Sequence, residues 1–156
     1  MPSGQRAQTE PCATIWRPET MRATADSLER IYNGYLDCLN RQDWPNLGQF
    51  VATDVCHNGR PFGLAGYQRL LEGDFRAIPD LQFRAEFIVT NPPLLGCRLV
   101  FDCTPVADLF GIAVNGRPVR FDEHVFYRFE TDRIAEVWSI IDQAAIARQV
   151  SGSSQR

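Results

Sequence analysis

Apolar and polar residues alternate along the stretch from Phe121 to Asp142, FDEHVFYRFETDRIAEVWSIID. Alternation with a period of two, carried by aromatic and β-branched residues, is typical of half-buried β-strands. Residues 130–133 (ETDR) interrupt it and indicate a tight turn, so the sequence predicts a β-hairpin. Glu123 and His124 are ionisable groups inside this apolar pattern. Such groups must be paired, solvated in a cavity or shifted in pKa, and we expect a pocket beside the hairpin.

Three helices are predicted before the main strands. The first follows Thr24, a residue type that favours the N-cap position, and its apolar residues recur at helical spacing. The second, at residues 44–51, is short and has Pro45 near its start. The third, at residues 64–78, carries an apolar stripe that Asp74 interrupts.

Strands account for most of the remaining pattern. Residues 53–58 (TDVCHN) are predicted to form a short strand that ends in His57 and Asn58. Further strands are expected at residues 81–90 and 95–105, before the hairpin, because proline and asparagine-glycine breaks separate these segments.

Helices followed by an antiparallel meander predict the α+β class. We expect a curved antiparallel or mixed sheet packed against three N-terminal helices, forming a cone with an interior pocket, and a short final helix at residues 143–150. The domain is expected at residues 23–150. A flexible N-terminal arm at residues 1–22 would precede it, and a flexible tail at residues 151–156 would follow it.

Composition excludes several classes of function. The 156 residues carry a net charge of −3, and the basic residues are scattered, so no nucleic-acid or anionic-membrane surface is expected. All 16 basic residues are arginine. Schiff-base catalysis, pyridoxal phosphate attachment and the P-loop lysine all need an ε-amine and are therefore excluded.

The cysteines and histidines indicate the cellular compartment and bear on metal binding. Five cysteines without C-x-x-C spacing are interpreted as small buried hydrophobic residues in a reducing compartment, so cytoplasmic localisation is expected. Only two histidines are present, and neither a metal site nor a cofactor is expected. The first 20 residues lack the continuous apolar run of a signal peptide or membrane span.

The order of the elements resembles the SnoaL-like polyketide cyclase family, within the nuclear-transport-factor-like cone superfold. The most specific parts are the motif R-I-x-E-x-W-x-x-x-D at residues 133–142 and Gly66 near the start of the third helix. The resemblance covers about residues 27–150. It implies cofactor-free ring closure, in which an aspartate on the last strand moves a proton at an acidic carbon of a polyketide ester.

Ser139 occupies the position of that aspartate in this chain. The family also has an asparagine where this chain has His57, and it has cavity-lining residues on the third helix near Asp74. The resemblance therefore implies a pocket in this region whose polar residues differ from those of the family.

The geometry of the hairpin relates these residues to one another. With a three-residue loop, Glu123 would face Ser139 and share the cavity wall with Tyr127, whereas a two-residue loop would break this pairing. The opposite face would carry His124, Phe126, Arg128, Glu136, Trp138 and Asp142. Because Phe126 and Trp138 form its aromatic centre, we expect a homodimer through this face.

The combined interpretation is a small protein that binds an apolar, oxygenated small molecule and performs cofactor-free acid/base chemistry on it. Cyclisation, isomerisation and hydration fit this description. The candidate catalytic residues are Glu123, Asp74 and His57: one of the two carboxyl groups would shuttle the proton, and the histidine would be the partner acid or orient the ligand. The candidate substrate-binding residues are Ser139, Tyr127 and Asn58.

Each candidate catalytic residue also has a structural interpretation. Glu123 could form a salt bridge with an arginine, and Asp74 could point along the helix edge into solvent. His57 could be a hydrogen-bonded surface residue at a strand end.

Two other functions remain open. Ser139 in place of an aspartate favours a ligand-binding or assembly module without catalysis. An epoxide-hydrolase-like enzyme would require Asp102, Arg98 and Asp74 to turn inward together. Strand alternation would turn Asp102 outward, and a bulge would reverse that.

Overall fold

The computed structural model of the chain describes residues 23–152. In chain order its elements are α1 (Ala25–Asn40), the 3-10 helix η2 (Trp44–Gln49), β1 (Val51–His57), β2 (Arg60–Pro61), α2 (Gly63–Ala77), β3 (Arg84–Asn91), β4 (Leu94–Cys103), β5 (Val119–Glu130), β6 (Arg133–Ile141) and α3 (Gln143–Ser151). The expected N-terminal arm and residues 153–156 of the expected tail lie outside the described residues. The final helix ends one residue beyond the predicted domain boundary.

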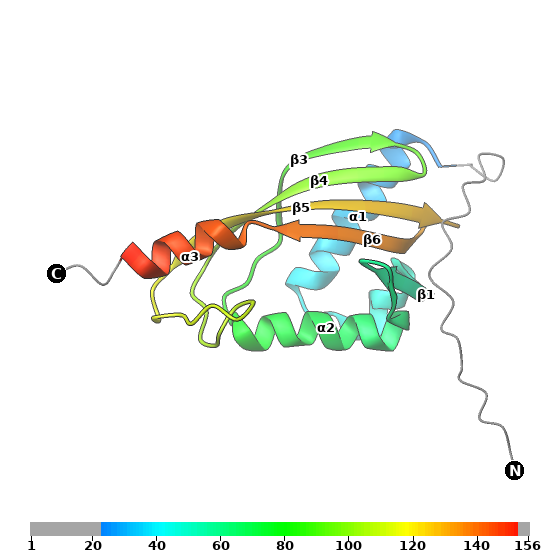
Figure 1. Ribbon diagram of the computed structural model, residues 1–156. Helices are drawn as coiled ribbons and strands as arrows, with labels where there is room; N and C mark the ends of the chain where they lie inside the picture. The colour runs from blue at the N-terminus through cyan, green and yellow to red at the C-terminus, as the bar shows by residue number, and fades with distance from the viewer. Residues whose placement is uncertain (1–22, 153–156) are drawn as a thin grey trace, which may run out of the picture.

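The six strands of the described region form one mixed sheet in the order β2-β1-β6-β5-β4-β3. β1 runs parallel to β6, and the other neighbouring strands are antiparallel. The sheet curves, and α1 and α2 lie on the same side of it (Figure 1). The predicted α+β class is therefore confirmed. The alternating pattern does not predict β2, because a strand of two residues is too short to show a period.

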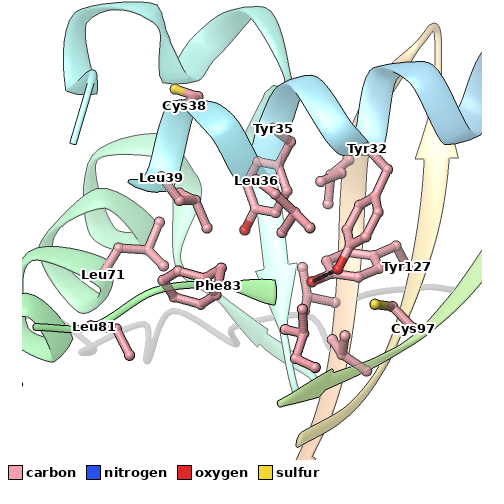
Figure 2. Close-up of a cluster of buried hydrophobic side chains, with 14 of the residues drawn as sticks. Tyr32, Tyr35, Leu36, Cys38, Leu39, Leu71, Leu81, Phe83, Cys97 and Tyr127 are labelled. Carbon is pink, nitrogen blue, oxygen red and sulfur yellow. Dashed lines mark hydrogen bonds between the residues drawn. The ribbon is translucent and has the colours of Figure 1, made fainter. Parts of the chain in front are cut away.

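The first helix begins as its sequence predicts. The Thr24 hydroxyl accepts a hydrogen bond from the Ser27 N–H at 3.1 Å, and the Ser27 hydroxyl accepts one from the Thr24 N–H at 2.9 Å. This reciprocal capping box satisfies two backbone donors at the helix start. Figure 2 shows Tyr32 pointing from α1 toward Tyr127 of β5. The apolar stripe of α1 therefore packs on the inner face of the sheet.

The β5–β6 hairpin has a different register from the predicted one. The two residues that flank residues 131–132 pair directly with each other, so the loop consists of residues 131–132. Both loop residues have left-handed backbone, with φ of 50° and 61°. This is a two-residue loop, and the expected three-residue loop is wrong. In the observed pairing Glu123 lies opposite Ile141 and not opposite Ser139.

A β-bulge in β6 nevertheless restores the predicted faces. The pairing shifts by one residue at Ala135, which has no partner of its own on β5. Because side chains alternate with a period of two, this extra residue compensates for the shorter loop. Glu123, Tyr127 and Ser139 therefore all reach the interior, as the sequence predicted.

The outer face of the sheet carries exposed large apolar side chains. Phe87, Val89, Phe126 and Ile140 are 54%, 56%, 56% and 76% exposed, respectively. Trp138 is half-buried and lies directly opposite Phe126. Three of the four strands β3 to β6 thus contribute to one exposed apolar surface.

Asp142 does not belong to that outer face. It follows the last residue of β6, and its carboxylate accepts a hydrogen bond from the Ala145 N–H at 3.0 Å. Its position is therefore set by capping of α3, an aspartate role that strand alternation does not reveal.

The cysteines differ from one another. Cys38, Cys97 and Cys103 are free and buried, as expected of small hydrophobic residues. Cys56 is disulfide-bonded, so the expectation of reduced thiols is wrong for this residue. Cys56 is half-buried near the end of β1, whereas the three free cysteines are buried.

Candidate functional site

A cavity of about 260 Å³ lies between the inner face of the sheet and the two helices. Most of its wall is apolar. Its polar lining comes from α1, α2, β1, β5, β6 and the segment between β4 and β5: Tyr35, Tyr67, Asp74, His57, Glu123, Tyr127, Ser139 and Asp108. The structure thus brings Glu123, Asp74 and His57 to one cavity.

The Glu123 carboxyl group lines the cavity and accepts a hydrogen bond from a neighbouring strand. The Ser139 hydroxyl donates to its Oε1 atom, diagonally across the β5–β6 pair. Burial raises the pKa of Glu123 to about 7, and the Asp74 charge adds to this rise, while the Ser139 hydrogen bond opposes it. None of the ion pairs within residues 23–152 includes Glu123, so the salt-bridge interpretation is not supported.

Asp74 faces the same cavity from α2. Asp74 is also an exposed residue. The surrounding protein nevertheless raises the pKa of Asp74 to about 6 through desolvation. Two carboxyl groups of one cavity therefore both titrate close to neutral pH.

His57, on β1, also lines the cavity. Its ring packs edge-on against Phe62, with ring centroids 5.9 Å apart, and lies 6.1 Å from the Tyr67 ring. Burial lowers the pKa of His57 below its ordinary value of 6.5. The imidazole is therefore neutral at neutral pH, and it can both donate and accept a hydrogen bond.

Asn58 is not among the residues that line the cavity. Its carboxamide binds the backbone of Ser139 instead: Oδ1 accepts from the Ser139 N–H at 2.8 Å, and Nδ2 donates to the Ser139 carbonyl at 3.3 Å. The Asn58 side chain thus contacts β6. Asn58 fixes the strand position that carries the Ser139 hydroxyl.

Two pairs of tyrosine hydroxyls lie beside the carboxyl groups. The Tyr35 and Tyr67 hydroxyls are 2.7 Å apart, and the Tyr32 hydroxyl donates to that of Tyr127 at 3.2 Å. Sequence reasoning identified only Tyr127 as a site residue. The other three belong to apolar helix stripes, where a tyrosine has the same spacing as a leucine, so no sequence signal separates them from the core.

The residues required for an epoxide-hydrolase-like site do not come together. Arg98 lies on the outer face of β4, where it pairs with Asp122 and, at 3.2 Å, with Glu86. Asp102 is exposed, and neither Asp102 nor Arg98 lines the cavity. Of the three residues, only Asp74 turns inward, so this alternative is wrong for the described structure.

Neither a metal cluster nor a membrane helix occurs within residues 23–152. No group of three or more His, Cys, Asp or Glu side chains there is arranged to hold a metal ion. None of the helices in this range has the length and apolar character needed to cross a bilayer.

Comparison with known proteins places these features in a family. The sequence model of the SnoaL-like polyketide cyclases matches residues 29–150. A SnoaL-like polyketide cyclase of Agrobacterium tumefaciens, solved by crystallography, is 53% identical to this chain, with a TM-score of 0.77, over 78% of this chain and 96% of that one. No protein of curated function matches the sequence.

More distant structures share the fold. IdmH of Streptomyces antibioticus is 21% identical with a TM-score of 0.70, over 80% of this chain and 98% of that one. TsrD of Streptomyces laurentii is 18% identical with a TM-score of 0.73, over 82% and 97% of the two chains. The family model and the structure that is 53% identical lead to one conclusion: this chain belongs to the SnoaL-like polyketide cyclase family.

Proposed function

We propose that this protein is a cofactor-independent acid/base enzyme that moves a proton at a carbon beside a carbonyl group of an apolar, uncharged small molecule. The observation that carries the proposal is the Glu123 carboxyl, which is desolvated on an apolar wall and has a pKa of about 7. A general base works best when its pKa lies near the working pH. Cyclisation or isomerisation through an enolate, and hydration, are reactions that this group could serve.

The position of the carboxyl group also supports the proposal. Ser139, which stands where the family resemblance places an aspartate, donates its hydroxyl proton to Glu123. A carboxyl group is therefore still present at this part of the cavity, supplied by β5 instead of β6. Ser139 orients the base, and its proton is not available to a substrate carbonyl while that hydrogen bond is made.

The other polar residues have complementary roles. Asp74 is electrostatically coupled to Glu123, so the two carboxyl groups titrate as an interacting pair. Neutral His57 can donate a proton or orient an oxygen of the substrate. Tyr127 accepts from Tyr32 and retains its own hydroxyl proton, which can be donated to the ligand.

The charge of the cavity supports an uncharged substrate. Apart from tyrosine, the ionisable residues among those that line it are Asp74, Asp108, Glu123 and His57. No arginine of the described chain is among them, so nothing in the lining would pair with a carboxylate or phosphate on the ligand.

Deuterium exchange into 1-tetralone, a bicyclic ketone with acidic C–H bonds next to its carbonyl, tests the proposal. Exchange in D2O, followed by NMR, is expected to be saturable and faster than in buffer. Glu123→Gln should slow it by about 100-fold or more, because a positioned general base contributes about that factor. Ser139→Ala, the matched control, keeps the base and should cause a smaller loss.

Two outcomes decide against this proposal. Undiminished exchange in Glu123→Gln would exclude Glu123 as the base. Binding of 1-tetralone without any exchange would favour the second candidate, a ligand-binding module that lacks catalysis, which is suggested by Ser139 at the position of the family's aspartate.

A further inference from the structure

Tyr35 and Tyr67 each have one hydroxyl proton, and the hydrogen bond between them uses only one of the two. The two hydroxyls are 2.7 Å apart, and either can be the donor. Two phenols carry two protons, and only one lies between their oxygens. Within residues 23–152, neither hydroxyl has another hydrogen-bond partner. In either orientation one O–H group remains to be donated.

The cavity is where that remaining proton can find an acceptor. The side chains of Tyr35 and Tyr67 are only 1% and 3% exposed, so bulk water scarcely reaches them, yet both residues line the cavity. A buried hydroxyl proton without an acceptor costs free energy. A ligand oxygen that enters the cavity would supply the missing acceptor.

The two phenols remain protonated at neutral pH. Burial is the main cause of a pKa above the ordinary value of 10 for both groups, and the nearby Glu123 charge raises each pKa further. The phenols are therefore hydrogen-bond donors and not bases. Both donors line the same cavity as the Glu123 carboxyl group.

We propose that the Tyr35–Tyr67 hydroxyl pair binds the carbonyl oxygen of the substrate and stabilises the negative charge that develops on it. This inference deepens the proposed function and rests on its assignment of the cavity. It adds to that function the residues that hold the carbonyl oxygen of the substrate.

The reaction step balances without an oxidant or cofactor. The Glu123 carboxylate takes the proton from the carbon, and the C–H electron pair becomes the C=C bond of an enolate. The carbonyl π electrons move to the oxygen, where the tyrosine pair donates a hydrogen bond to the new charge. Protonated Glu123 can then return its proton to the product.

Binding of two matched probes to the 156-residue protein tests the assignment. 1-Tetralone contains the carbonyl oxygen, and tetralin is the corresponding hydrocarbon without it. At about pH 8.5 most Glu123 is ionised, because its pKa is about 7, and so it does not donate to the ketone. Calorimetric dissociation constants give the ketone-to-hydrocarbon ratio, and the infrared carbonyl stretch of bound 1-tetralone reports its hydrogen bonds.

Tyr67→Phe should weaken 1-tetralone binding by about 3- to 10-fold, the effect of one lost hydrogen bond, and leave tetralin binding unchanged. The carbonyl stretch should move toward its frequency in an apolar solvent. Tyr35→Phe removes the other member of the pair and should lower the same ratio. Tyr32→Phe is the matched control, since its buried hydroxyl bonds Tyr127 and Tyr32 is not among the cavity-lining residues.

An unchanged ketone-to-hydrocarbon ratio in folded Tyr67→Phe and Tyr35→Phe would overturn the inference. A carbonyl stretch in the wild type that already matches an apolar solvent would overturn it even if neither variant folds. A tyrosine-dependent ratio without exchange chemistry would refute only the proposed function, and exchange without a tyrosine-dependent ratio would refute only this inference.

Discussion

The raised pKa of Glu123 links the site to the stability of the fold. The ordinary glutamate value of 4.5 applies to the unfolded chain, and the folded value is about 7. Between these values the folded state binds the extra proton, so the free energy of unfolding decreases as pH rises through this window. Asp74 contributes with the same sign between 3.8 and about 6.

We therefore predict that Glu123→Gln stabilises the protein at about pH 8 and has little effect near pH 4.5. The upper limit of the difference is about 3 kcal/mol, at about 1.4 kcal/mol per pKa unit. Urea unfolding at both pH values measures it. Glu29→Gln, at an exposed position of α1, is the control. Equal destabilisation by Glu123→Gln at both pH values would mean that Glu123 has a structural role.

At the scale of secondary structure, the bulge at Ala135 decides which side chains of β6 reach the cavity. Residues 136–141 lie beyond the bulge, and a shift of one residue there would turn each of their side chains to the opposite face. Val137 and Ser139 would leave the interior, and Trp138 would have to enter it.

Deletion of Ala135 is therefore predicted to abolish 1-tetralone binding and to lower the melting temperature strongly or prevent folding. Circular dichroism and calorimetry measure these effects. Deletion of Ala113, an exposed residue between β4 and β5, should be much less harmful. A deletion variant of Ala135 that melts and binds like the wild type would show that the register of β6 is set elsewhere.

The hairpin also shows which features of the site the sequence pattern predicts and which it does not. Alternation predicts which residues share a face, because every second side chain meets the same environment, and it correctly directs Glu123 and Ser139 inward. It does not predict their diagonal contact, because loop length and the bulge have compensating effects that no residue type in 130–135 reveals. The tyrosine pairs join separate elements, so their contacts depend on packing angles that a helical stripe does not encode.

At the scale of the whole molecule, the outer face of the sheet carries apolar side chains that no other part of the described chain covers. Exposed Phe87, Val89, Phe126 and Ile140 lie there beside half-buried Trp138. An apolar surface formed by several strands is more often a contact surface than a bare face in a soluble protein. We therefore retain the homodimer through Phe126 and Trp138 as a prediction.

Trp138→Glu is predicted to convert a dimer to a monomer, because it places a charge at the centre of this face. Sedimentation velocity over a range of protein concentrations measures the change. Val106→Glu is the control, since Val106 is 66% exposed but lies in the segment between β4 and β5, outside the sheet. A wild-type protein that is already monomeric would contradict the predicted interface.

The segment between β4 and β5 contributes Asp108, Leu109 and Phe110 to the cavity, whereas the proposed base and the serine that orients it are on β5 and β6. Connecting segments tolerate insertions and substitutions better than the strands of a sheet do. Substrate size and shape can therefore diversify through this segment while the proton-transfer residues remain in place. For laboratory evolution, residues 108–110 are the natural first library, because they offer new specificity at the lowest risk to the chemistry.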